Sequence, residues 1–289
     1  EMMTAFGALA EWDAVALVHA EDEGLISSLA ERLTPEQLGR MRTLAEARPD
    51  LCERSAIVSV ARIASSTGCR THIVHVSSLQ GLEAVREGRT AGALLTAETC
   101  PQYLLLTRDV YDRDDGHLFS ASPALRSDGD RAALWGGLRH RDIDFVTTDH
   151  CPFTSKQKAW RGDFRDLPYG LPGVETLLPL VYSEGVGCGI LSLNDIPRLL
   201  SEGPARTFGL HPRKGAIEAG ADADLVVFDP GKTWRVSASD LHMNVDFSPY
   251  EGREVTGRVD VTISRGTVLF RDGELSAESG RGAYIGRSA

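Results

Sequence analysis

The chain has 289 residues, of which 42% are hydrophobic and 25% are charged, so it is long enough to bury a substantial core. Its 31 basic and 41 acidic residues give a net charge of −10, which argues against a nucleic-acid partner, because such proteins carry a basic footprint. No run of about 18 apolar residues is present, which argues against a membrane span. The start lacks the basic and apolar regions of a signal peptide, and the five scattered cysteines form no C-x-x-C pair, so we expect a cytoplasmic protein with reduced thiols.

Short apolar runs alternate with helical patterns over the first two-thirds of the chain. Apolar runs predict strands at 14–18, 93–96 and 143–148, and a strand whose apolar end at 73–74 leads into His75. Apolar periodicity or capping residues predict helices at 53–66, 77–88, 130–139, 174–183 and 194–208. Thr34-Pro35-Glu36-Gln37 is typical of a capped helix start, and Gly68 of a helix end. The alternation predicts a parallel sheet in an α/β fold.

The pattern changes after Phe153. The segment 156–170 is polar with scattered aromatic residues and is typical of a long surface loop. Further along, segments at 224–228, 233–236, 255–263 and 267–270 predict strands joined by Gly and Asp turns, and hence a small β domain. The tail at 276–289 is rich in Gly, Ser and Arg, and we expect it to fray.

His19, His75 and Asp149 share one kind of position, since each follows a predicted apolar strand. In parallel α/β folds the carboxyl ends of the strands are where catalytic groups converge. Two neutral imidazoles and a carboxylate suit a hydrolytic metal ion such as zinc, which lowers the pKa of a water while the carboxylate shuttles its proton. The alternative is structural: a histidine after a strand is often a hydrogen-bonded turn residue, and an aspartate there is often a helix N-cap.

Other polar residues near these strands also carry two interpretations. His150 either orients a metal-binding carboxylate through a hydrogen bond or is a turn residue. Glu98 is either catalytic or a buried glutamate bonded to the backbone. His72 lies three positions before His75, so we place it on the opposite strand face as a packing or surface residue. Cys151 has no paired base, which argues against a nucleophile.

Eight short motifs occur in an order that closely resembles the dihydropyrimidinase/hydantoinase family of cyclic amidohydrolases. They are VHAE (18–21), IVHVSS (73–78), ETCPQYL (98–104), SPALR (122–126), TDHCPF (148–153), GLPGVE (170–175), PRKG (212–215) and ADADLV (221–226). The resemblance runs over nearly the whole chain, to about residue 273. The collinear set is far more specific than any one motif.

The resemblance implies a (β/α)8 TIM-type barrel with a binuclear centre of Zn²⁺ or another divalent ion such as Mn²⁺, together with a β-sandwich. It implies hydrolysis of the cyclic amide bond of dihydropyrimidines or 5-substituted hydantoins, which gives N-carbamoyl amino acids. By position, His19 and His75 would bind the more exposed metal, and Asp149 would bind the other metal and shuttle the proton. Ser122 and Tyr169 match stretches that hold the ureide ring through backbone groups.

This sequence departs from the family pattern in two places. The H-x-H motif of the first barrel strand and the metal-bridging lysine are absent, so we expect the C-terminal part of a longer enzyme, inactive by itself. We divide it into a partial barrel at 1–212, a sandwich segment at 213–275 and a flexible tail at 276–289. The second departure is Tyr169, which stands where the family usually has Asn and alters the pocket wall.

Two groups of alternatives remain open at this point. One is a related cyclic amidohydrolase, an allantoinase or dihydroorotase, and the other is a non-catalytic scaffold homologue of the dihydropyrimidinase type. Scaffold homologues lose metal ligands, whereas His19, His75 and Asp149 are all present. We expect a small cyclic ureide as the partner, no nucleic acid or membrane, and a homo-oligomer, which is a tetramer in the family.

Overall fold

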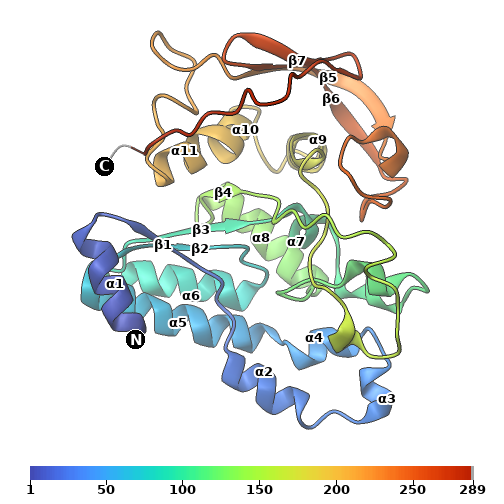
Figure 1. The fold of residues 1–289 in the computed structure, drawn as a ribbon. Coiled ribbons are helices and arrows are strands. Elements are labelled where there is room, and N and C mark those ends of the chain that lie inside the picture. The colour runs from blue at the N-terminus through green and yellow to red at the C-terminus, as the bar shows by residue number, and fades with distance from the viewer. Residues whose placement is uncertain (288–289) are drawn as a thin grey trace. The chain divides into compact units, whose positions relative to one another are not determined.

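The computed structural model describes residues 1–287, which form two compact units. The first unit comprises residues 1–175 and 237–251, and the second comprises residues 176–236 together with the chain from Gly252 onward. Each unit has its own sheet (Figure 1). Among the described residues, no helix is both long and apolar enough to cross a membrane.

The first unit contains a parallel sheet, as the sequence predicts. Its strands are β1 (Val15–Val18), β2 (Arg70–Ile73), β3 (Leu95–Thr99) and β4 (Phe145–Val146), in that spatial order. Val18 lies opposite Ile73, and Glu98 lies opposite Phe145, so the strands end near one sheet edge. No other strand within residues 1–287 pairs with the outer side of β1 or of β4.

Two long helices lie along one face of this sheet (Figure 1). α5 (Asp50–Thr67) packs against α6 (Leu79–Thr90), and a Cβ added at Gly88 would lie 2.7 Å from the Cβ of Ala61, so glycine permits this close approach. The predicted stop at Gly68 is confirmed, with φ of +70°. The remaining helices and 3₁₀ turns of this unit are α1 (Met2–Glu11), α2 (Glu23–Ala30), α3 (Pro35–Leu38), α4 (Thr43–Ala47), α7 (Pro101–Leu105), α8 (Asp128–His140), η1 (Arg108–Asp112), η2 (Gly116–Phe119), η3 (Phe164–Asp166) and η6 (Ala238–Asp240).

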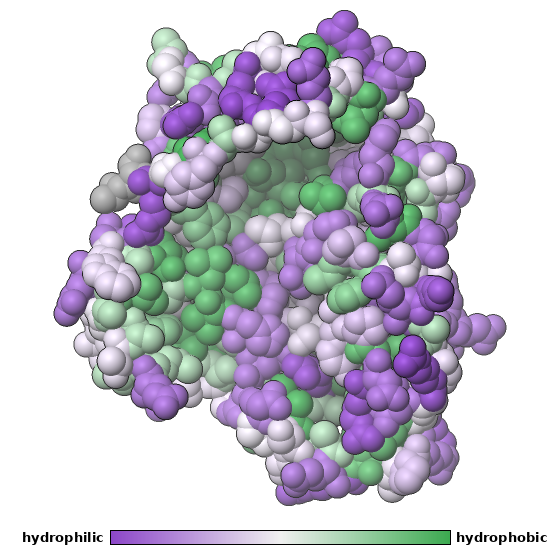
Figure 2. All heavy atoms as spheres, in the orientation of Figure 1, coloured by the Kyte–Doolittle hydropathy of each residue, from purple (hydrophilic) through white to green (hydrophobic). Residues whose placement is uncertain are grey.

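The core of the first unit is aliphatic and lies between the sheet and its helices. Its fully buried side chains include Leu44, Ile57, Ile73, Leu82, Leu134, Leu138, Ile143 and Phe145. Hydrophobic surface also remains outside the core, on the side of this unit where α1 and β1 lie (Figure 2). These elements and the turn between them expose Met2, Met3, Trp12 and Leu17.

The segment 156–170 corrects one prediction. It has little regular structure, as expected, but it is not simply a surface loop, because Lys158, Phe164 and Leu167 are buried. The strands predicted at 73–74, 93–96 and 143–148 are also shifted, to β2, β3 and β4. Hydrogen bonding to β3 nevertheless continues beyond β4, since Asp144 N donates to Ala97 O at 2.9 Å and Thr147 N to Thr99 O at 3.0 Å.

The second unit joins a short helical region to an antiparallel sheet. The sheet has the order β5 (Leu225–Arg235), β6 (Glu254–Ser264), β7 (Thr267–Arg271) and β8 (Glu274–Leu275). The two strands predicted at 224–228 and 233–236 are one strand, because the residues between Asp229 and Thr233 form a register shift and not a turn. The helical region contains α9 (Leu177–Val181), the π-helical turn η4 (Tyr182–Val186), α10 (Asp195–Pro197), the π-helical turn η5 (Arg198–Glu202) and α11 (Gly203–Thr207).

The tail continues beyond the last strand. Residues 276–287 form neither a helix nor a strand, and the rest of the predicted tail, 288–289, lies outside the described residues.

Candidate functional site

Two of the predicted site residues meet at the carboxyl ends of adjacent parallel strands. His19 follows β1 directly, and His75 follows β2 by two residues. Their ring nitrogens Nδ1 of His19 and Nε2 of His75 are 2.8 Å apart, and the rings meet edge-on with their centroids 4.7 Å apart. Because β1 and β2 run in parallel and in register, two imidazoles 56 positions apart in the chain come within hydrogen-bonding distance of one another.

The two histidines differ in their surroundings. His75 is 7% exposed, and burial together with the neighbouring charge of His19 lowers its pKa to about 4. It is therefore neutral at physiological pH, which is the form that binds a metal ion. The His19 side chain is 45% exposed, so the pair opens to solvent on that side.

Asp149 lies three residues beyond β4, at the same edge of the sheet. The Asp149 side chain reaches solvent. Partial burial raises its pKa, and the negative charge of Glu98 raises it further, whereas the charge of His19 lowers it. A carboxyl group with a raised pKa exchanges a proton more readily near neutral pH than an ordinary aspartate does. These influences place Asp149, Glu98 and His19 in one electrostatic environment.

Glu98, which is buried at the end of β3, is held by two neighbouring side chains. Its Oε1 accepts a hydrogen bond from Thr147 Oγ1 at 2.7 Å, and its Oε2 lies 3.1 Å from His72 Nε2. The glutamate is therefore held by side chains and not by the backbone. His72 is fully buried and stacks on Phe145, with ring centroids 4.8 Å apart, so it is a packing residue and not a surface one.

Glu21 is a site residue that the sequence did not single out. Its carboxylate is 1% exposed, and its Oε2 lies 3.3 Å from His19 Nε2, 2.6 Å from Arg48 Nη2 and 2.9 Å from Ser122 Oγ. Burial alone would raise the pKa of Glu21, but hydrogen bonds from His19 and Arg48 and the positive charges of Arg48 and Arg126 lower it to about 2. Glu21 thus joins the histidine pair to the segment that contains Ser122.

The remaining predicted residues lie around this network. Arg48 Nη2 also donates to Ser122 Oγ at 2.8 Å, and its guanidinium lies 5.8 Å from the ring centre of Tyr169. The Tyr169 hydroxyl donates to Phe164 O at 3.3 Å. His150 points its Nδ1 at the backbone and accepts hydrogen bonds from the N–H groups of Gly173 and Val174, at 3.0 and 3.3 Å, so this nitrogen orders a loop.

These residues fit part of a zinc site. Zinc in proteins takes about four donors, chiefly imidazole nitrogen, thiolate and carboxylate oxygen. His19 Nδ1 and His75 Nε2 face one another as two such candidate ligand atoms, and His75 Nδ1 is buried with no side-chain or backbone hydrogen-bond partner within residues 1–287. Within residues 1–287, no group of three or more His, Cys, Asp or Glu side chains is already gathered tightly enough to hold a metal ion.

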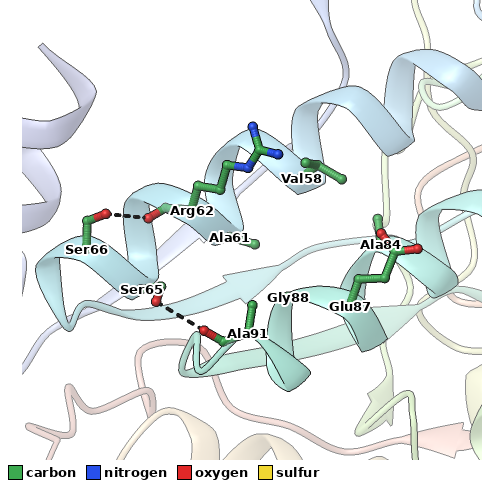
Figure 3. Close-up of a pocket in the computed structure, with 9 residues that line it drawn as sticks. All are labelled: Val58, Ala61, Arg62, Ser65, Ser66, Ala84, Glu87, Gly88 and Ala91. Carbon is green, nitrogen blue, oxygen red and sulfur yellow. Dashed lines mark hydrogen bonds between the residues drawn. The ribbon is translucent and has the colours of Figure 1, made fainter.

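A separate hollow lies between two helices and is not lined by any of the predicted site residues. It has a volume of about 520 Å³ between α5 and α6, and its walls include Ala61, Ser65 and Gly88 (Figure 3). Ser65 Oγ donates across it to Ala91 O at 3.4 Å, which makes it a seam between two packed helices.

A parallel α/β sheet with paired histidines and an aspartate at its carboxyl edge is typical of metal-dependent hydrolases. Comparison with known proteins agrees, because the profile of the amidohydrolase family matches residues 6–269. The chain belongs to the amidohydrolase family. This result bears out the expected class of protein.

Individual relatives indicate the type of amidohydrolase that the chain resembles. The chain is 39% identical to D-phenylhydantoinase of Escherichia coli O1:K1 / APEC over 290 residues, which cover 99% of this chain and 63% of the relative. Among solved structures, it is similar to D-hydantoinase from Bacillus sp. AR9 (TM-score 0.96, 35% identity) and to dihydropyrimidinase from Brevibacillus agri (TM-score 0.96, 33% identity), with 99% of this chain and 63% of each structure covered. L-Hydantoinase from Arthrobacter aurescens matches with a TM-score of 0.89 and 32% identity over 96% of this chain and 61% of that structure. The chain therefore spans less than two thirds of the length of these relatives.

Proposed function

We propose that the intact protein hydrolyses the cyclic amide bond of dihydropyrimidines or 5-substituted hydantoins and releases N-carbamoyl amino acids. The observation that carries this proposal is the facing pair of His19 and His75 nitrogens, 2.8 Å apart at the carboxyl edge of a parallel sheet. The similarity to hydantoinases and a dihydropyrimidinase supports the choice of a cyclic ureide.

The proposed metal ligands are His19, His75 and Asp149. We infer Zn²⁺ in a binuclear centre, with Mn²⁺ or another divalent ion as a substitute. When bound, such an ion supplies a Lewis acid that polarises a carbonyl group and lowers the pKa of water. Glu21 holds the opposite nitrogen of His19 at 3.3 Å, which fixes the ring so that Nδ1 faces His75.

Asp149 is the residue we propose as the proton shuttle. Hydrolysis joins the oxygen of water to the ring carbonyl carbon, and the bond from that carbon to the ring nitrogen breaks. Asp149 takes a proton from the water and returns it to the departing nitrogen, so the carboxylate is regenerated. Its raised pKa suits both halves of this transfer.

Ser122 and Tyr169 are the residues we propose to border the ureide ring through backbone groups. Ser122 is tied to Glu21 and Arg48 by its hydroxyl, which leaves its backbone to face a ligand. We also propose that the partner of the protein is a small cyclic ureide. We infer that the intact protein is a homo-oligomer whose fold is a complete (β/α)8 barrel with a β-sandwich. An allantoinase, a dihydroorotase or a non-catalytic scaffold is less favoured, because the similar proteins are hydantoinases and a dihydropyrimidinase.

The first test of this proposal is metal binding by the histidine pair. Purified protein, stripped with a chelator, is titrated with Zn²⁺ and its metal content is measured by elemental analysis. His19→Ala and His75→Ala should each lower the stoichiometry, whereas His140→Ala, at the exposed end of α8, should leave it unchanged. Equal zinc content in all four proteins would remove the pair from the ligand set.

The second test is turnover by the intact protein. Ring opening of dihydrouracil and of 5-phenylhydantoin is followed by the appearance of the N-carbamoyl product, with and without chelator. Asp149→Asn should abolish turnover while part of the zinc stays bound, because the amide cannot carry the proton. Unchanged turnover in this variant would contradict the proton-shuttle role.

A further inference from the structure

Lys158 is a buried lysine that the proposed reaction does not use. Its side chain is 0% exposed, in a segment whose polar composition predicted a surface loop. Its Nζ donates to the backbone oxygen of Ser120 at 2.8 Å and to the hydroxyl of Ser120 at 2.7 Å. No ion pair joins Lys158 to a carboxylate within residues 1–287, although burying an unpaired ammonium group is costly.

Ser120, the partner of Lys158, also holds the chain on both sides of Tyr169. The backbone N–H of Gly170 donates to Ser120 O at 2.9 Å, and Ser120 Oγ donates to Pro168 O at 2.9 Å. Ser120 is itself fully buried. Both oxygen atoms that accept from Lys158 therefore take part in the hydrogen bonds that fasten the residues before and after Tyr169.

The same segment is fixed to the edge of the sheet. Cys151 N donates to Leu171 O at 3.0 Å, and a Cβ at Gly170 would lie 2.5 Å from Cys151 Sγ, so the backbone here passes very close to the chain that follows Asp149. Ser120 in turn precedes Ser122 by two residues. One buried ammonium group thus sits where the two proposed substrate-binding stretches meet.

We propose that Lys158 is a positioning residue for the substrate pocket, which acts through Ser120 to hold the backbone around Ser122 and Tyr169 in register. This inference rests on the proposed function for its statement about substrate. Its structural part, that Lys158 fastens the 168–170 segment to Ser120, stands on the hydrogen bonds alone. The hydrogen bonds of Lys158 go to Ser120 and not to the histidine pair.

Lys158 suits a positioning role better than a simple packing role for two physical reasons. A buried methionine would fill the same space without the cost of desolvating an amine, and burial lowers the pKa of Lys158 to about 7. A lysine contributes what an apolar side chain cannot, which is several directed donors that can bond to a carbonyl and a hydroxyl together. A lysine at this position therefore lowers the stability of the fold but fixes the geometry of Ser120.

The structural part is tested by hydrogen exchange. Lys158→Met keeps the volume and removes the donors, Lys158→Gln keeps one donor group, and Lys156→Met is the matched control at an exposed lysine of the same segment. Lys158→Met should raise the exchange rate of the Gly170 amide about ten-fold, with a smaller rise for Lys158→Gln. Amides of the sheet, such as Thr71 N bonded to Leu94 O, should keep their protection in every variant.

Unchanged exchange at Gly170 in a folded Lys158→Met protein would overturn the inference. Equal loss of protection at Gly170 and across the sheet would overturn it too, because that result indicates general destabilisation. If Lys158→Met fails to fold, the same comparison is made between Lys158→Gln and the control. A local rise confined to the amides of residues 169–171 supports the inference.

The substrate part is tested by titration with dihydrouracil and 5-phenylhydantoin in the presence of Zn²⁺. Lys158→Met should weaken binding of both ureides about ten-fold, while its zinc stoichiometry matches that of Lys156→Met. Tight ureide binding that is unaffected by Lys158→Met would overturn the positioning role in the pocket. Absence of ureide binding by the intact, unaltered protein would instead overturn the proposed function, and exchange at Gly170 would still decide the structural part.

Discussion

The carboxylate of Glu21 provides the sharpest test of how this site is held together. Glu21→Gln keeps the shape of the side chain and removes its charge beside Arg48, which lies 2.6 Å away and is itself only 15% exposed. The pKa of Glu21 is about 2 in the folded protein, against 4.5 for the free side chain. This difference corresponds to about 3 kcal/mol of stability at neutral pH, which the variant should lose.

The sign of the pH dependence follows from the lowered pKa. Folding favours the ionised carboxylate, so its contribution is complete above about pH 4.5 and is lost as the pH falls towards about 2. Glutamine does not titrate in this range. The gap in stability between the unaltered protein and Glu21→Gln should therefore be widest at neutral pH and should close progressively below pH 4.5.

Urea denaturation followed by circular dichroism measures this gap, with a chelator present so that metal bound near His19 does not contribute. Glu36→Gln is the matched control, because Glu36 forms an exposed ion pair with Arg40 and its replacement should cost no measurable stability. A gap of constant size from pH 7 to pH 3 would refute the electrostatic reasoning. A loss no larger than that of Glu36→Gln would also refute it.

Two further predictions concern the segment around Tyr169. Gly170→Ala should destabilise the protein by about 2–3 kcal/mol, since its φ is +135° and the new Cβ would meet Cys151 Sγ at 2.5 Å. Gly162→Ala, with φ of +95° and open space around it, should cost only about 1 kcal/mol; equal urea midpoints for the two variants would contradict the close contact. Tyr169→Asn removes a bulky phenol from beside Arg48, so it should improve the affinity for 5-phenylhydantoin relative to dihydrouracil several-fold. Calorimetric titration measures this ratio, and a ratio that stays the same would separate Tyr169 from substrate preference.

Much of the sheet and of the histidine pair could be predicted because the relevant signals are local. An apolar run marks β1, and the apolar pair at residues 73–74 marks the carboxyl end of β2. Parallel strands bring their carboxyl ends to one edge whatever lies between them in the chain. The position of His19 and His75 relative to these runs therefore indicated their proximity. Capping residues act locally as well, and Thr34 and Gln37 form the expected reciprocal cap of α3.

The network around Glu21 could not be predicted in the same way. Its partners Arg48, Ser122 and Arg126 come from segments that are 27 or more residues away, and no periodicity marks a buried carboxylate. Lys158 was missed for a related reason, since a lysine in a polar segment carries no sign that tertiary contacts bury it. The prediction of two strands within β5 failed because Pro230 and Gly231, typical turn residues, are accommodated as an irregularity inside one strand.

The backbone conformation at two of the three proposed metal ligands affects how variants of this site are interpreted. His75 and Asp149 have φ of +42° and +45°, a left-handed conformation that costs about 1–2 kcal/mol for most residues with a side chain and almost nothing for glycine. An alanine at either place deletes the functional group and retains that conformational cost, whereas a glycine deletes the group and relieves it. A His75→Gly protein that is at least as stable as His75→Ala, yet equally poor in zinc, would show that this histidine is retained for its chemistry against the preference of the polypeptide.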